Sequence, residues 1–241
     1  MKHLFVTGTD TGIGKTIVSA WLCKHWEADY WKPVQSGLEG GSDSEWVARF
    51  SHARIHPETH RLTQPLSPHQ AAEIDGVKIQ LSDFELPQTE RLVVEGAGGS
   101  LVPLNWRDTM LDLMKHLGSC ALLVARSGLG TINHTCLSLQ ALKGAGVPVL
   151  GVILVGEVNS ANREAIEHFG EVPVLAELPV FNEISEQALS AFGMPERLVR
   201  ALNSLYGRPA TSQLSHTNLL QPPPPPPWHP FTHIPTTPPP L

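Results

Sequence analysis

The sequence predicts an α/β fold in which a doubly wound, mainly parallel sheet forms the middle of three layers, α/β/α. Two observations predict this class. Short apolar runs of strand length alternate along the chain with segments of helical periodicity, which is typical of repeated β-α units. Several runs, among them LVVEG, CALLVA and VLGVILV, are continuously apolar, as expected for strands that helices cover on both faces.

The individual elements follow from these runs in chain order. We expect strands over residues 4–7, 30–34, 92–95, 120–125, 147–155 and 172–178. We expect helices over residues 16–26, 43–51, 109–117, 132–145, 161–169 and 195–205, each after a turn or capping signal. Ser42 and Asn159 are two such signals, because their side chains can accept hydrogen bonds from amides at a helix start.

The composition indicates a folded, soluble domain that acts on small molecules. The 241 residues are 41% hydrophobic and 17% charged, and the net charge of −6 provides no positive field for nucleic acid or anionic lipid. The apolar stretch at the start is too short for a signal peptide or membrane helix, so we expect a cytoplasmic protein without nucleic-acid or membrane partners. Cys23, Cys120 and Cys136 show no metal-ligand spacing, and we expect reduced core thiols.

The last 35 residues differ in character from the rest of the chain. They hold twelve of the 22 prolines, including the unbroken run 222–227, which lacks amide donors and favours an extended polyproline helix. We therefore expect a folded domain over residues 1–206 and a disordered tail over residues 207–241. A ligand for a polyproline-binding domain is the alternative interpretation of this tail.

The stretch GTDTGIGKT follows the first expected strand and opens the first expected helix. This is the context of a phosphate-binding loop, and it predicts a P-loop NTPase-like fold, although five residues separate Gly8 from Gly14 where four is usual. Gly12 and Gly14 let backbone amides approach phosphate oxygens, and Lys15 supplies a charge for the outer phosphates. Thr16 would place its hydroxyl on Mg²⁺. The alternative is a glycine-rich turn without a ligand.

Two acids and one lysine are candidates for the same site. Ligands in open α/β sheets bind beyond the carboxyl ends of the strands, where Glu95 ends the run LVVEG. Asp43, after a glycine-rich loop, is a second candidate, with plain helix capping as the alternative; for Glu95 the alternative is a solvated strand-end acid. Lys32 lies in the apolar stretch YWKPV, where it either extends to the surface or stabilises charge in the site.

The same residues belong to a set of ordered stretches that resembles the dethiobiotin synthetase family of ATP-dependent cyclo-ligases. The matching stretches are VTGTDTGIGKT, WKPVQSG, Ser42-Asp43, LSPH, VEGAGG, LGTINH and AELP, over roughly residues 4–190. The resemblance implies a homodimer that converts 7,8-diaminononanoate (7,8-diaminopelargonate), CO₂ and MgATP to dethiobiotin, ADP and phosphate in biotin biosynthesis. It also implies a carbamate that attacks the γ-phosphate, followed by ring closure through the second amine.

The resemblance implies a site residue by residue. Lys15 and Lys32 would be the catalytic cations. The implied nucleotide-binding residues are Asp10, Thr11, Gly12, Ile13, Gly14, Lys15, Thr16, Asp43, Glu95, Pro179 and Glu183, with Thr16, Asp43 and Glu95 around Mg²⁺. The implied substrate-binding residues are Thr11, Ser36, Gly96, Gly98 and Gly99, together with backbone amides of the other subunit that correspond to Thr131, Ile132 and Asn133.

The chain departs from the family where members often carry an Asn-Asp pair to bind adenine. Here the sequence is Val155-Gly156-Glu157, so base contacts would be looser or made by the backbone, and the loop with Asn182 and Glu183 would supply the rest. His134 is expected to pack against its helix neighbours. In the tail, WHPFT at residues 228–232 resembles the opening of the aminotransferase that makes the diamine, which would make the chain part of a fusion.

The main alternative function is that of a switch ATPase of the partitioning or nitrogenase-iron-protein type, which shares the unusual loop spacing. Those proteins carry a signature lysine near the loop start, where this chain has Asp10. A cobyrinate-type amide synthase would need a glutaminase domain for which no length remains. A nucleotide-binding pseudoenzyme is disfavoured because Lys15, Thr16, Lys32 and Glu95 are all present.

Overall fold

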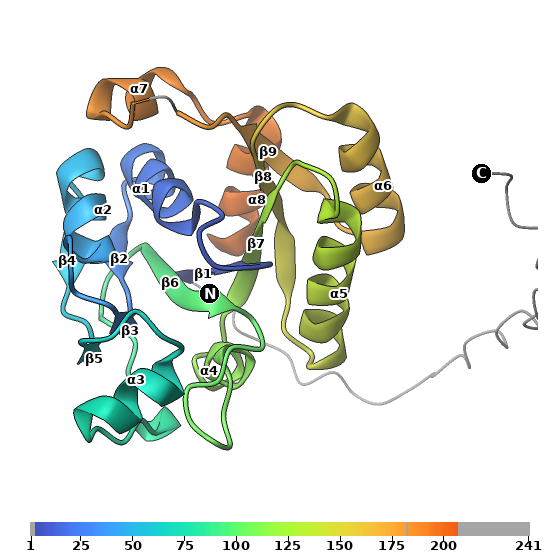
Figure 1. The fold of residues 1–241 in the computed structure, drawn as a ribbon. Coiled ribbons are helices and arrows are strands. Elements are labelled where there is room, and N and C mark those ends of the chain that lie inside the picture. The colour runs from blue at the N-terminus through green and yellow to red at the C-terminus, as the bar shows by residue number, and fades with distance from the viewer. Residues whose placement is uncertain (1–2, 182, 207–241) are drawn as a thin grey trace, which may run out of the picture. The chain divides into compact units, whose positions relative to one another are not determined.

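The computed structural model describes residues 3–181 and 183–206, and within them a seven-stranded parallel sheet forms the centre of the fold (Figure 1). The strand order is β4-β2-β6-β1-β7-β8-β9. The strands are β1 (His3–Gly8), β2 (Asp29–Trp31), β4 (Ile55–His56), β6 (Leu92–Gly99), β7 (Cys120–Arg126), β8 (Val149–Val155) and β9 (Val174–Leu178). A separate parallel pair is formed by β3 (Val34–Ser36) and β5 (His60–Leu62).

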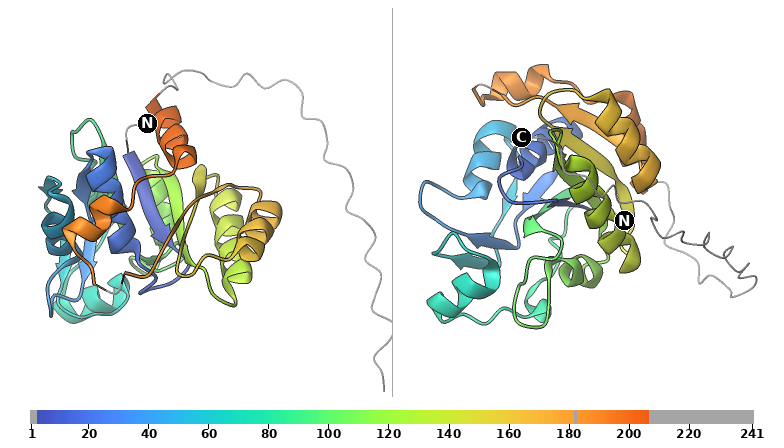
Figure 2. Two further views of the ribbon diagram at one scale, coloured as in Figure 1. Left: turned by 90° about the horizontal axis from the view of Figure 1, so that it is seen from above. Right: turned by 45° about the vertical axis from the view of Figure 1, so that its right-hand side comes forward.

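Helices cover both faces of the sheet, as predicted for a doubly wound fold. They are α1 (Lys15–Trp26), α2 (Asp43–Ser51), α3 (Pro68–Asp75), α4 (Met110–His116), α5 (Thr131–Gly144), α6 (Ser160–Gly170), α7 (Glu186–Ala191) and α8 (Glu196–Tyr206), with a 3₁₀ turn η1 (Leu81–Asp83). One core cluster joins the sheet to α1, α2, α7 and α8, and two clusters on the other face include α3, α4, α5 and α6. Figure 2 shows α5 and α6 side by side on that second face.

Alternation along β1 shows how the sequence divides between the two faces. Leu4 and Val6 pack under α1, whereas Phe5 packs in the opposite cluster, and all three are fully buried. β1 lies in the middle of the sheet, between β6 and β7. The chain leaves β1 through α1 toward one edge and later returns through α4 toward the other. The carboxyl end of β1 is therefore the point at which an open α/β sheet binds its ligand.

The six predicted helices are confirmed, each to within one residue of its expected ends. The single strand expected over residues 30–34 is wrong: it is divided into β2 and β3 at Lys32 and Pro33, because proline has no amide to donate to a ladder. The strands expected from residues 147 and 172 begin two residues later, directly after Pro148 and Pro173. Strand β6 extends to Gly99 and so carries the glycines after Glu95.

Several elements have no counterpart in the predictions. β4, β5, α3, α7 and η1 are all short, and their local patterns are too brief to stand out from loops. Of the three cysteines, Cys23 and Cys120 are buried, but the expectation of a core thiol is wrong for Cys136, which is half-buried on α5. The tail of residues 207–241, including its polyproline run and WHPFT, lies outside the described residues. Among the described helices, none has both the length and the apolar character that crossing a membrane requires.

Candidate functional site

The phosphate-loop sequence connects β1 to α1, as its spacing predicts. Gly12 and Gly14 adopt φ angles of 68° and 97°, in the left-handed region that glycine enters without steric cost. Gly14 is the N-cap of α1 and has no side chain to cap it, so the first amides of the helix face the loop. A Cβ at Gly8 would lie 2.7 Å from Ile13 Cδ1, so the loop folds closely over its own start.

Lys15 begins α1 with its ammonium group held inside this loop. Its Nζ donates to the carbonyl oxygen of Asp10 at 2.9 Å, and the side chain is largely buried. Burial lowers the pKa of Lys15, and the charge of Glu95 opposes that shift only in part. The Asp10 carboxylate accepts from the Thr11 amide at 2.7 Å and pairs with Arg126 at 2.8 Å. The loop therefore holds a desolvated cation whose charge an anion would satisfy.

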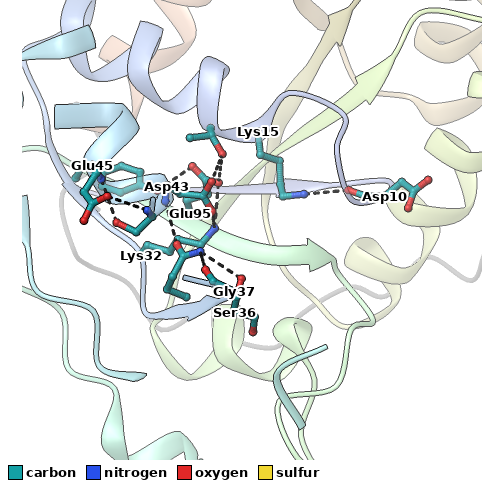
Figure 3. A network of polar contacts seen from close by, with 12 residues as sticks. Asp10, Lys15, Lys32, Ser36, Gly37, Asp43, Glu45 and Glu95 are labelled. Carbon is teal, nitrogen blue, oxygen red and sulfur yellow. Dashed lines mark hydrogen bonds and ion pairs between the residues drawn. The ribbon is translucent and has the colours of Figure 1, made fainter. Parts of the chain in front are cut away.

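Two carboxylates, a hydroxyl and a second lysine meet beside the loop (Figure 3). Thr16 Oγ1 lies 2.8 Å from Asp43 Oδ1 and 3.0 Å from Glu95 Oε1. Lys32 Nζ pairs with Asp43 Oδ2 at 2.5 Å and with Glu95 Oε1 at 3.2 Å. Lys32 is 4% exposed and Glu95 1% exposed. The alternatives that Lys32 extends to the surface and that Glu95 is a solvated strand-end acid are therefore both wrong.

The charges of this cluster shift one another's protonation. Burial acts to raise the pKa of Asp43, but the Lys32 ammonium and the Thr16 hydroxyl outweigh it, and the pKa lies below the ordinary value. Burial likewise acts to lower the pKa of Lys32, but Glu95 and Asp43 outweigh it and the pKa is raised. At neutral pH the cluster therefore holds a charged lysine beside an ionised Asp43.

The N-terminal end of α2 and the Gln35 side chain hold Asp43 beside the cluster. Ser42 is the N-cap of α2, since its hydroxyl accepts from the Glu45 amide at 3.2 Å while the Glu45 carboxylate accepts from the Ser42 amide at 3.1 Å. The capping interpretation of Asp43 is therefore wrong, because Ser42 performs that task. The buried Gln35 side chain accepts from the Asp43 amide at 3.1 Å and donates to the Gly37 carbonyl at 3.0 Å.

A cleft of about 740 Å³ opens over this cluster. The predicted site residues that line it are Thr11, Gly12, Gly14, Lys15, Thr16, Lys32, Ser36, Asp43, Glu95 and Gly98. Asp10 and Gly99 instead line a neighbouring cavity of about 420 Å³, which shares Thr11 and Val102 with the cleft. The structure thus brings together residues that are up to 87 positions apart in the chain, from Thr11 to Gly98.

The other predicted site residues lie away from the cleft within one chain. Ile13 and Gly96 are buried and line neither cavity, and a Cβ at Gly96 would lie 2.8 Å from the Phe5 ring. Pro179 and Glu183 are exposed beyond β9, and Asn182 is outside the described residues. Thr131, Ile132 and Asn133 begin α5 and line neither cavity. The expectation that His134 packs against its neighbours is wrong, since this histidine is exposed.

Some residues of the site were not among those predicted. Tyr30 Oη donates to Glu95 Oε2 at 3.0 Å, and Gln35 holds the Asp43 amide. Pro65, Leu66, Ser67, Pro68, Gln70, Ala97 and Val102 complete the cleft lining. A tyrosine two positions before the unusual Lys32 was the available signal for Tyr30, because alternate residues of a strand share a face.

A phosphate loop at the carboxyl end of the central strand, with a buried lysine and acids beside its threonine, defines a P-loop nucleotide-binding protein. A family model described as an AAA domain matches residues 2–188. The chain is 53% identical over 197 residues to an ATP-dependent dethiobiotin synthetase of Paramagnetospirillum magneticum, covering 81% of this chain and 96% of that protein. A synthetase of Brucella ovis is 51% identical, with 78% and 91% covered. The chain belongs to the dethiobiotin synthetase family.

Solved structures of more distant proteins share the fold. The cell division ATPase MinD of Pyrococcus furiosus matches with a TM-score of 0.50 and 18% identity, over 85% of this chain and 100% of that one. The septum site-determining protein MinD of Pyrococcus horikoshii, complexed with Mg-ADP, matches with the same TM-score and identity over 85% and 93%. At this identity the likeness shows the fold alone, which confirms the P-loop NTPase-like class.

Proposed function

We propose that this chain catalyses the ATP-dependent formation of dethiobiotin from 7,8-diaminononanoate and CO₂, releasing ADP and phosphate, in biotin biosynthesis. The observation that carries the proposal is the buried Lys32, which pairs with Asp43 and Glu95 beside the phosphate loop. A cation in that place suits a reaction that transfers a phosphoryl group to a carbamate. The family membership supplies the identity of the reaction.

The cluster beside the loop fits a magnesium ion. Thr16 Oγ1 lies within hydrogen-bonding distance of both Asp43 Oδ1 and Glu95 Oε1, and hydroxyl and carboxylate oxygens are the ligands that Mg²⁺ accepts. These three residues would hold the ion. When bound with ATP, Mg²⁺ would neutralise charge on the phosphate oxygens.

The chain's own residues would divide the chemistry as follows. One amine of the diamine adds to CO₂ and loses a proton, and a carbamate oxygen then attacks the γ-phosphorus as ADP leaves. Lys15 and Lys32 would stabilise the charge that develops on the transferred phosphoryl group and the carbamate. The second amine then attacks the carbamate carbon, closes the ureido ring and expels phosphate.

Ser36 is suited to position the reacting amine or carbamate. Its Oγ is buried and has no hydrogen-bond partner within the described part of the chain, and the residue lines the cleft. A buried hydroxyl without a partner is costly unless a ligand satisfies it. We assign Ser36 a role in orienting the substrate, together with Thr11 and Gly98, which also line the cleft.

We propose that the active form is a homodimer in which the start of α5 serves the partner's site. No side chain caps this helix, whose N-cap is Gly130, and a helix start favours an anion such as the substrate carboxylate. Thr131, Ile132 and Asn133 would supply the amides, which explains their position away from the cleft of their own chain. Three further predictions stand beside this proposal. Pro179 and Glu183 would contact the base, residues 1–206 would form the ligase domain, and the protein would be cytoplasmic.

Phosphate release tests the proposed reaction. Purified protein is given MgATP and bicarbonate, with and without 7,8-diaminononanoate, and phosphate is measured over time. The proposal predicts release that depends on the diamine. Release at the same rate without the diamine would contradict it and would favour the switch ATPase of the partitioning type.

A further inference from the structure

We propose that Tyr30 is a positioning residue that fixes the orientation of the Glu95 carboxylate for the metal-nucleotide complex. The inference rests on the proposed role of Glu95. Tyr30 Oη donates to Glu95 Oε2 at 3.0 Å, while Glu95 Oε1 faces Thr16 and Lys32. Tyr30 does not line the cleft, so it would act on the reaction only through Glu95.

The register of two neighbouring strands creates this contact. Tyr30 on β2 pairs with Val93 on β6, and the strands are parallel. Glu95 stands two residues beyond Val93 and therefore on the same face of the sheet. Lys32 stands two residues beyond Tyr30. The tyrosine hydroxyl therefore reaches the carboxylate from the interior, behind the side that faces the cleft.

The tyrosine ring is held rigidly in this position. Tyr30 is fully buried in the core cluster beneath α1 and α2, where the cluster also includes Cys23, Val47 and Phe50. Its backbone amide donates to the Arg54 carbonyl at 2.9 Å, which joins it to the start of β4. A hydroxyl on such a ring cannot follow the carboxylate if the latter turns. It selects one orientation instead.

The two oxygens of Glu95 then have different tasks. Oε2 accepts the hydrogen bond from the Tyr30 hydroxyl in the interior, and Oε1 remains available to the Thr16 hydroxyl, the Lys32 ammonium group and the proposed metal. Without Tyr30 Oη, a buried carboxylate oxygen would lose its donor, and the carboxylate would turn or admit water. Groups that orient a metal ligand in this way commonly change metal affinity by about 10–100-fold when removed.

Tyr30→Phe tests the inference, because it removes one oxygen and keeps the ring. The measurement is ADP binding by titration calorimetry, once with Mg²⁺ and once with EDTA. The dissociation constant in EDTA divided by the dissociation constant with Mg²⁺ reports how strongly the metal supports nucleotide binding. We expect Tyr30→Phe to reduce this ratio by about ten-fold. ADP affinity in EDTA should stay within about two-fold of the wild type.

Ser51→Ala is the matched control. Ser51 Oγ donates to the Val47 carbonyl at 2.6 Å and accepts from the Ala53 amide at 3.1 Å, so the variant also loses the hydrogen bonds of a buried hydroxyl, but at the far end of α2 from Asp43. Its Mg²⁺ ratio should equal that of the wild type. An unchanged ratio in Tyr30→Phe would overturn the inference. Equal losses with Mg²⁺ and with EDTA would also overturn it, because they indicate general damage. The binding assay uses no diamine, so its outcome is independent of whether dethiobiotin is made.

Discussion

Removal of the Lys32 charge tests the electrostatic account of the site at its centre. Lys32→Met keeps the buried stem and deletes the ammonium group, which leaves Glu95 and Asp43 facing each other without a cation. Breaking a buried ion pair by removing one partner costs about 3–5 kcal/mol. The Asp43 side chain is 31% exposed, so solvent screening places the expected loss near the lower end, at about 3 kcal/mol.

Urea unfolding at neutral pH measures this loss, with Lys24→Met as the matched control. Lys24 pairs with Glu186 at 2.9 Å, but that carboxylate is 41% exposed, and an exposed pair contributes only about 0–1 kcal/mol. With an m-value of about 3 kcal/mol/M, Lys32→Met should lower the urea midpoint by about 1 M and Lys24→Met by much less. Equal, small losses in both variants would refute the description of Lys32 as a buried cation of the site.

The same lysine is assigned a role in turnover. Lys32→Ala should abolish diamine-dependent phosphate release, because the cation that stabilises the carbamate and phosphoryl charge is lost. The variant should remain folded, since a native domain is commonly stable by about 5–15 kcal/mol. Far-ultraviolet circular dichroism checks the fold in the same preparation. Activity like that of the wild type would remove the assigned role.

Three further predictions follow from the site and its supports. Lys15→Ala should abolish phosphate release without lowering the melting temperature, since burial already penalises its ammonium group and lowers its pKa. The pKa of Asp43 is depressed in the folded state, so its ionised form stabilises the protein above the unfolded pKa of about 3.9. This contribution is lost as the pH falls through the folded pKa. The difference in unfolding free energy between wild type and Asp43→Asn should therefore shrink in urea titrations below about pH 4. Ser42→Ala should cost about 1 kcal/mol in urea unfolding through the lost cap of α2, and no loss would contradict the capping box.

Local patterns are sufficient to predict the phosphate loop and the six helices α1, α2, α4, α5, α6 and α8. Glycines, lysine and threonine of the loop are contiguous, and their conformational needs are fixed by their own chemistry. The capping residues Ser42 and Asn159 are also local, and both accept the expected amide bonds. Lys32 stands out in the sequence because burying a lysine in an apolar stretch costs free energy unless its charge is paired.

The features that sequence could not supply depend on which segments become neighbours. Tyr30 meets Glu95 only because β2 pairs with β6, across 65 residues of chain. The exposure of His134 and Cys136 depends on which side of α5 the sheet covers, and the mixed polarity of that helix does not reveal it. The break at Pro33 is not evident from the sequence, because the apolar run continues through it although the strand ladder does not.

The central claim, that this site couples ATP cleavage to ureido ring formation, is tested most directly by product stoichiometry. Protein is incubated with MgATP, ¹³C-bicarbonate and 7,8-diaminononanoate, and dethiobiotin and phosphate are quantified together by mass spectrometry and a phosphate assay. The account predicts equal amounts of the two products, with the label in the ureido carbonyl carbon. Phosphate without labelled dethiobiotin would contradict it.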